Sequence, residues 1–394
     1  MTAIPKKTAR LKGLLLILAL VPLSLLWGEV FTRALLPQNV DSRMNIFVAD
    51  PVIGYTYKPH AQTYEKGREY NALYRINSIG LRDREYGSKR EGVFRVLLLG
   101  DSFSVSHGMA IEDSLSRQLE RALRETAEME GRPIAFEVIN AAAGGYSPYN
   151  YWRAYQRWAP VFKPDAVLVG LSPDDYDCDN ENMTYLIEEG ETLALYREGQ
   201  APKARKTLST RKLRKWLSWN SEFYILLRNY FYYGEIAGRI GRWMNPGGNK
   251  DNSQLKWYTV SQQENMRKAW ERSFSNLQKL KRETEVDRVP LVLMPMPLKL
   301  EIDKELYSAT LAAQGLREET VDLDQQLREI SAFCEREKIP VLDPREALRK
   351  RHAEVPCYFV YDGHWVAEGI RTAAVSAARQ WRDRGLPPWN QSSK

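Results

Sequence analysis

Cysteine and histidine are scarce in this chain of 394 residues, which contains three cysteines and four histidines. No two cysteines form a CxxC motif, so neither a redox motif nor a zinc ribbon is expected. In an exported protein, Cys334 and Cys357 could form one disulfide and leave Cys178 as a thiol. Three separate buried thiols are an equal alternative.

The chain also lacks the motifs GxxxxGK and GxGxxG, so a phosphate-binding loop has no support. No solenoid repeat and no zinc-finger spacing occurs. The formal net charge is +7, but the excess of positive charge comes from two clusters. They consist of Lys6, Lys7, Arg10 and Lys12, and of Lys203, Arg205, Lys206, Arg211, Lys212, Arg214 and Lys215. The rest of the chain is net negative, so the sequence predicts no nucleic acid partner.

An uncharged, apolar run from Gly13 to Gly28 follows the first basic cluster. Positive charge on the N-terminal side of such a run keeps that side in the cytoplasm. We therefore expect a cytoplasmic basic tail (residues 1–12) and a signal-anchor transmembrane helix (residues 13–35). A cleaved signal peptide is the alternative, although no Ala-x-Ala-like site follows the run. The predicted location is the inner membrane, single-pass, with the rest of the chain on the periplasmic or extracellular side.

Short apolar runs alternate with amphipathic stretches along the rest of the chain. The runs predict strands at 94–100, 136–143, 165–171, 289–295 and 339–343. The amphipathic stretches predict one helix that Asp113 could cap. They predict further helices at 149–159, 261–282, 319–336 and 366–383. This alternation indicates an α/β fold with a parallel sheet covered by helices. Reactive groups in such folds gather beyond the carboxyl ends of the strands.

Two segments depart from this alternation. Residues 36–92 form a lead-in segment before the first strand. Residues 176–260 form an insertion, expected to be helical, in which the second basic cluster precedes an aromatic-rich stretch. The aromatic side chains could pack on the sheet, lie against anionic lipid headgroups or stack on sugar rings. The sequence leaves these three alternatives open.

A serine and a histidine stand at positions suited to nucleophilic chemistry. Ser102 directly follows the first predicted strand, where its hydroxyl would be exposed beside backbone N–H donors. His364 follows Asp362 by two residues in the stretch YDGHW. A carboxylate at this spacing can hold the imidazole in one tautomer, which is what a hydrolase triad requires.

Four blocks together resemble those of SGNH/GDSL hydrolases. They are GDSF at 100–103, NAAAGGYS at 140–147, PDAVLVGL at 164–171 and DGHW at 362–365, and the resemblance covers about 94–175 and 287–383. Upstream, residues 50–59 and 76–83 look like the lead-in of membrane-anchored bacterial members, similar to proteins of exopolysaccharide (alginate-type) O-acetylation. The resemblance implies a flavodoxin-like three-layer sandwich over residues 93–386, a tail at 387–394, a Ser-His-Asp site, no metal and no cofactor.

The resemblance also assigns roles to single residues. Ser102 is the expected nucleophile, His364 its general base and Asp362 the residue that orients the base. The N–H groups of Ser102 and Gly145 are expected in the oxyanion hole. Asp174 stands where the family has an asparagine that completes the hole. An ionised Asp174 would repel an oxyanion, whereas a protonated one would act as a donor.

These expectations combine into a membrane-tethered, extracytoplasmic serine esterase or acyltransferase. It would form an acyl-serine intermediate and act on O-acetylated carbohydrate or exopolysaccharide, with a polysaccharide export or modification complex as a further expected partner. One alternative is a lipid esterase or thioesterase. Another is a non-catalytic, polysaccharide-binding component of an export complex, which Asp174 and the aromatic insertion would favour.

Overall fold

The structure is a computed structural model. It describes residues 6–36, 46–66, 69–176, 183–188, 192–197, 213, 216, 217, 220–233, 255 and 258–389. The chain divides into two compact units, which are described separately. The smaller unit comprises residues 1–42 and 202–250, and the larger comprises residues 43–201 and 251–394.

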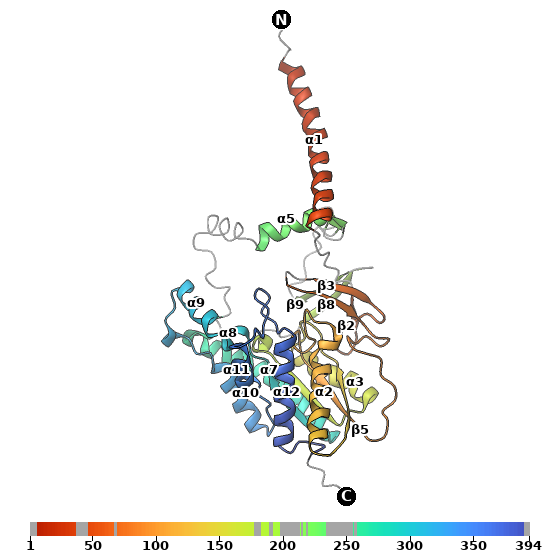
Figure 1. Cartoon of the computed structure of the whole chain (residues 1–394), viewed down its shortest axis with the longest axis vertical. Helices are drawn as coiled ribbons and strands as arrows, with labels where there is room; N and C mark the ends of the chain where they lie inside the picture. The colour runs from red at the N-terminus through yellow and green to blue at the C-terminus, as the bar shows by residue number, and fades with distance from the viewer. Residues whose placement is uncertain are drawn as a thin grey trace. The chain divides into compact units, whose positions relative to one another are not determined.

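A four-stranded parallel sheet forms the centre of the larger unit (Figure 1). Its strands are β5 (Val93–Leu99), β6 (Ala135–Asn140), β7 (Ala166–Leu171) and β10 (Leu291–Pro295), in the order β10-β7-β5-β6. The prediction of a parallel α/β sheet is confirmed. The fifth predicted strand, 339–343, contributes only an isolated bridge between Val341 and Leu293. Pro340 has no N–H to donate to a ladder, which explains why the pairing stops there.

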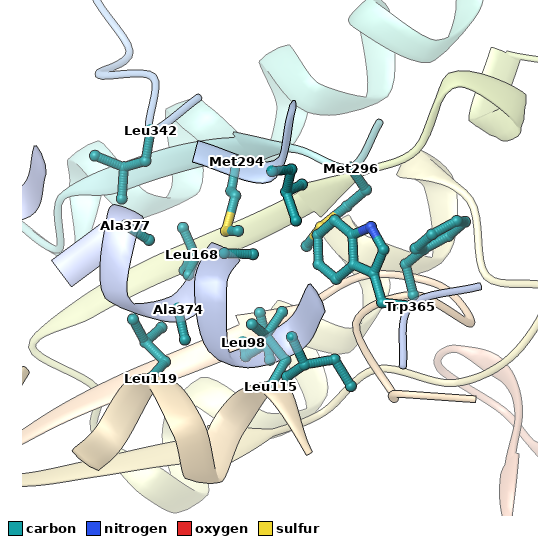
Figure 2. Packing of buried hydrophobic residues seen from close by; sticks show 14 of the residues in the cluster. Leu98, Leu115, Leu119, Leu168, Met294, Met296, Leu342, Trp365, Ala374 and Ala377 are labelled. Atoms are coloured by element: carbon teal, nitrogen blue, oxygen red, sulfur yellow. The ribbon is translucent and has the colours of Figure 1, made fainter. Parts of the chain in front are cut away.

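Helices cover both faces of this sheet, because successive strand residues point to opposite faces. The described α-helices of the larger unit are α2 (Leu115–Met129), α3 (Pro148–Phe162), α7 (Gln263–Val286), α8 (Lys299–Ile302), α9 (Lys304–Gln314), α10 (Gln325–Arg336), α11 (Arg345–His352) and α12 (Ala367–Asp383). On one face, Leu97 and Leu99 share a core with α3, α7 and α10. On the other, Leu98 and Leu168 pack against α2 and α12 (Figure 2). The result is the three-layer arrangement that the sequence predicts.

The lead-in segment and the insertion both contain short antiparallel hairpins. In the lead-in segment, β1 (Phe47–Asp50) pairs with β2 (Gly54–Tyr57), and β3 (Gln62–Lys66) pairs with β4 (Asn71–Arg75). In the insertion, β8 (Met183–Glu188) pairs with β9 (Thr192–Arg197). The insertion is therefore not purely helical as predicted. All basic residues of its second basic cluster, from Lys203 to Lys215, lie outside the described residues.

Cys334 and Cys357 do not form the disulfide that the sequence left open as one of two alternatives. Both are free, buried thiols. Cys334 belongs to the core on the α3 and α7 side of the sheet, whereas Cys357 belongs to the core on the α2 and α12 side. Because the sheet separates the two side chains, the alternative of separate thiols holds for this pair. Cys178 lies outside the described residues.

The smaller unit contains α1 (Lys6–Leu35) and α5 (Glu222–Tyr233). The Glu29 carboxylate of α1 accepts hydrogen bonds from the Ser221 hydroxyl and from the first backbone N–H groups of α5. Among the described residues, no helix combines the length and the apolar character needed to cross a membrane. The structure therefore does not support the transmembrane helix predicted over residues 13–35.

Close packing of α12 on the chain that precedes the His364 loop gives a first testable prediction. A Cβ atom at Gly369 would lie 2.1 Å from the backbone oxygen of Cys357. Backbone cannot move aside as a flexible side chain can, so Gly369→Ala should lower the free energy of unfolding by about 1–3 kcal/mol in urea denaturation. At Gly87 a Cβ meets nothing within 4 Å, so Gly87→Ala is the matched control. Equal stability of the two variants would contradict this packing.

Candidate active site

The structure brings Ser102, His364 and Asp362 together at the carboxyl end of the sheet. The Ser102 Oγ lies 2.8 Å from the His364 Nε2. On the other side of the ring, the His364 Nδ1 contacts the Asp362 carboxylate. Ser102 follows β5, and the other two precede α12, so residues that are far apart in the chain meet here. This is the geometry in which a base can take a serine proton while a carboxylate holds the base.

The Asp362 carboxylate is partly buried and strongly held in its charged form. Burial alone would raise the pKa of Asp362, but interactions with His107 and His364 outweigh burial and hold the pKa well below its usual range. An ionised Asp362 accepts only, so it fixes the His364 proton on Nδ1. The lone pair of Nε2 is then directed at Ser102.

Two glycines allow the turn that carries Ser102. A Cβ at Gly100 would lie 1.9 Å from the Ser104 Oγ, and one at Gly170 on β7 would lie 2.2 Å from the same atom. The Asp101 carboxylate then accepts a hydrogen bond of 2.9 Å from the Phe103 N–H. The glycine of the GDSF block is therefore required for the close passage of this turn over the sheet.

The residues predicted for the oxyanion hole lie on the neighbouring loops. Gly145, which follows β6, has a φ of +80°, and a Cβ there would lie 3.0 Å from the Tyr55 hydroxyl. Asp174 lies in the short 3-10 helix Pro173–Tyr176 after β7, but its side chain lies outside the described residues. Its neighbour Asp175 is buried and accepts hydrogen bonds from the Tyr151 hydroxyl and the Ser172 N–H. The hole formed by Ser102, Gly145 and Asp174 stays a prediction.

The lead-in segment contacts the loop that carries Ser102, which sequence reasoning missed. Arg82 is buried, and its guanidinium donates to the backbone oxygens of Val105, Ser106 and Met109. The neighbouring Asp83 accepts a hydrogen bond from the Asn140 N–H at the end of β6. Both residues stand in the 76–83 block, so the sequence marked their position without indicating their contacts.

The lead-in segment also holds the loop that carries Gly145. The Tyr55 hydroxyl of β2 donates to the Gly144 backbone oxygen at 2.9 Å. In return, the Tyr146 hydroxyl donates to the Tyr55 backbone oxygen at 2.7 Å. Hydroxyl groups on both sides therefore connect β2 to the predicted oxyanion loop.

A third contact joins the β3–β4 hairpin to the loop that carries Asp362. The Glu69 carboxylate accepts hydrogen bonds from the backbone N–H groups of Val360, Tyr361 and Asp362, at 2.7, 2.6 and 3.2 Å. The hydroxyl of the next residue, Tyr70, donates to the Asp362 carboxylate at 2.9 Å. No motif in the sequence indicates either residue, because both partners lie almost 300 positions away.

A second histidine, His107, lies beside the predicted triad. Its ring centroid is 4.5 Å from that of His364. Metal-ligating atoms of His107, Asp362 and His364 lie within 4.8 Å of one another. Each of these atoms is already used in a hydrogen bond or ion pair of the site, including one between the His107 Nδ1 and Glu65. The arrangement therefore fits a proton network better than a metal centre.

The contact with Glu69 gives a second prediction. Glu69→Gln replaces one accepting oxygen by an amide group that cannot accept, so the amides of residues 360–362 should exchange hydrogen about tenfold faster, as expected for loss of a charged hydrogen bond. Hydrogen exchange read by mass spectrometry or NMR measures this. The exposed Glu91 supplies the control Glu91→Gln, which should leave these amides unchanged. Unchanged exchange in both variants would show that Glu69 does not hold the loop.

Residues 255–394 match the family model described as "SGNH hydrolase-like domain, acetyltransferase AlgX". This range includes Asp362 and His364, while Ser102 lies outside it. A comparison with curated proteins gives no match.

Solved structures of esterases and related proteins are similar over most of the chain. TesA has 11% sequence identity and a TM-score of 0.37, and the match covers 73% of this chain and 98% of that one. The acetyl xylan esterase AlAXEase has 12% identity and a TM-score of 0.34, with 72% and 97% covered. The esterase EstA from Pseudoalteromonas sp. has 12% identity and a TM-score of 0.34, with 73% and 98% covered. With TM-scores below 0.5, these structures do not identify the family of this chain.

The family model, the parallel sheet and the contact of Ser102 with His364 agree with the resemblance in the sequence blocks. The activity class of this superfamily is that of serine ester hydrolases and O-acyltransferases. Residues 255–394 are therefore identified as an SGNH hydrolase-like domain of the AlgX acetyltransferase type.

Proposed function

We propose that the protein is a serine esterase or O-acyltransferase that acts on O-acetylated extracellular carbohydrate through an acyl-Ser102 intermediate. The observation that carries the proposal is the hydrogen-bonding distance of 2.8 Å between the Ser102 Oγ and the His364 Nε2. A serine hydroxyl is a weak nucleophile unless a base accepts its proton, and this contact supplies the base.

The reaction proceeds in two steps. Ser102 Oγ attacks the ester carbonyl carbon while His364 Nε2 takes the serine proton. The tetrahedral intermediate collapses, the alcohol leaves with the proton from His364, and the acyl group remains on Ser102. Water or a sugar hydroxyl then attacks the acyl carbon, His364 takes its proton, and Ser102 leaves as the restored hydroxyl. Asp362 stays ionised and stabilises the imidazolium in both steps.

The negative oxygen of each tetrahedral intermediate needs hydrogen-bond donors. We assign the backbone N–H groups of Ser102 and Gly145 to this role, because both follow parallel strands at the same edge of the sheet. The positive φ of Gly145 and the hydrogen bond from the Tyr55 hydroxyl to the Gly144 backbone oxygen support a fixed loop at that point. Asp174 is the proposed third donor, in its protonated form.

Two observations favour carbohydrate esters as substrates. The family model over residues 255–394 carries the name of an acetyltransferase, AlgX. The lead-in blocks of the sequence resemble those of proteins of exopolysaccharide O-acetylation. An acetylated uronic-acid oligosaccharide is therefore the first substrate to test, with an export or modification complex as the proposed setting.

Removal of the Ser102 hydroxyl or of the His364 imidazole should abolish turnover of an acetyl ester. Ser102→Ala and His364→Ala should each lower kcat about ten thousandfold, and the double variant should be no slower than either single one, because the residues act as a unit. Asp362→Asn should be milder but still severe. His352→Ala is the control, since His352 contacts Asp303 and the Cys357 N–H away from Ser102. Inactivation by His352→Ala alone would show that the base is misassigned.

Covalent labelling and product analysis test the intermediate and the substrate class. A fluorophosphonate should label the wild-type chain at Ser102, with loss of fluoride, and should not label Ser102→Ala. The value of kcat/KM should be higher for an acetylated uronic-acid oligosaccharide than for a long-chain fatty ester. The reverse preference would favour a lipid esterase, and an absence of labelling and turnover would indicate a non-catalytic protein.

We further propose an inner-membrane location, with the larger unit on the periplasmic or extracellular side. The support is the order of basic residues and the apolar run from Gly13 to Gly28 in the sequence. A reporter enzyme fused after residue 40 should be active only in the exported compartment, and the full chain should stay with membranes after a high-salt wash. Reporter activity in the cytoplasm would refute the orientation, and a soluble processed chain would refute the tether.

A further inference from the structure

We propose that His107 is a positioning residue of the triad, and that its positively charged imidazolium, held by Glu65 and Tyr70, keeps Asp362 ionised and aimed at His364. The inference rests on the proposed function, because it concerns the same reaction at Ser102. His107 lies on the loop after β5, five residues beyond the nucleophile. His107 therefore connects the loop that carries Ser102 to the loop that carries Asp362. It lies near the Asp362 oxygen that does not contact His364.

The hydrogen bonds define where the protons lie. The Tyr70 hydroxyl has one proton and donates it to the Asp362 Oδ2 at 2.9 Å. Its oxygen must then accept from the His107 Nε2, which lies 2.7 Å away. The His107 Nδ1 lies 2.8 Å from the Glu65 Oε1 and donates to it. With a proton on both nitrogens, His107 is an imidazolium, and its Nε2 is 3.5 Å from the Asp362 carboxylate.

Glu65 is built to hold this charge. Its side chain is only 2% exposed, and its second oxygen accepts a hydrogen bond of 2.7 Å from the Gly108 N–H. Burial would raise the pKa of Glu65, but the hydrogen bond and the charge of His107 lower it to about 2. A buried carboxylate with these partners costs free energy if its positive partner is removed. Glu65 therefore keeps His107 in its positively charged form beside Asp362.

The groups that face His107 come from three segments. They are Glu65 on β3, Tyr70 before β4, and Asp362 with His364 before α12. Burial lowers the pKa of His107, but the interactions with Asp362 and Glu65 outweigh burial and raise it to about 9. Because the folded pKa lies above the ordinary value, the stabilisation from His107 is complete below about pH 6.5 and is lost as the pH rises through 9.

A matched set of variants tests the role of this charge. His107→Gln alone leaves Glu65 buried without its cation, so the double variant Glu65→Gln/His107→Gln removes both charges together and protects the fold. Tyr70→Phe removes only the hydroxyl between His107 and Asp362. Each should lower kcat for an acetyl ester, by about tenfold for the double variant, with little change in KM. The exposed His60 supplies the control His60→Gln, which should have no effect.

Coupling to Asp362 distinguishes a positioning role from a merely structural one. In an Asp362→Asn background, adding the double variant should lower kcat by less than about twofold, because no carboxylate charge is left to position. Wild-type activity should fall as the pH rises through about 9, where His107 loses its proton, and the double variant should lack this alkaline decline. Equal losses in both backgrounds, or the same decline in both enzymes, would overturn the inference.

The two proposals fail in different ways. A wild-type chain without ester turnover refutes the proposed function. Wild-type turnover with an unaffected double variant refutes only the role of His107. The same mutant cycle in the free energy of unfolding reports on the coupling of His107 with Asp362 in either case. Additive stability changes there would show that the two side chains do not interact.

Discussion

The carboxylate of Asp362 is the group on which the proposed active site depends. One of its oxygens contacts the His364 Nδ1, and the other accepts from Tyr70 and lies near the His107 Nε2. The loop that carries Asp362 is itself held through three backbone N–H groups by Glu69. A carboxylate with this many partners stays ionised and in place, and an ionised acceptor is what keeps the His364 proton on the side away from Ser102. In the proposed mechanism, the reactivity of Ser102 would therefore depend on contacts of Asp362 that do not involve Ser102 itself.

The lead-in segment contacts all three loops of the proposed site. Arg82 holds the serine loop, Tyr55 holds the glycine loop, and Glu69 and Tyr70 hold the acid loop. In an α/β sheet the loops at the carboxyl ends of the strands carry the chemistry but have little structure of their own. The two small hairpins before the first sheet strand, together with Arg82 after them, hold these loops in place. Through these four residues the lead-in segment supports the loops of the proposed active site.

The sequence predicted the sheet well and the support of the site poorly. Buried parallel strands are local apolar runs, so β5, β6, β7 and β10 could be located from composition alone. Ser102 and His364 could be paired only through the resemblance of the blocks, because 262 positions separate them. The partnership of Tyr70 with Asp362 spans 292 positions and has no local signal. The sequence left the choice between a disulfide and separate thiols open for a related reason, since only the fold places Cys334 and Cys357 on opposite faces of the sheet.

The protonation states of the two histidines beside Asp362 are the most direct test of this account. Nitrogen-15 NMR of histidine-labelled wild-type protein near pH 8 reports which ring nitrogens carry protons. We predict protons on both nitrogens of His107, and for His364 a proton on Nδ1 with Nε2 accepting from Ser102. The His107 signals should change to those of the neutral form only as the pH rises through about 9. A neutral His107 at pH 8, or a His364 with its proton on Nε2 alone, would contradict the account.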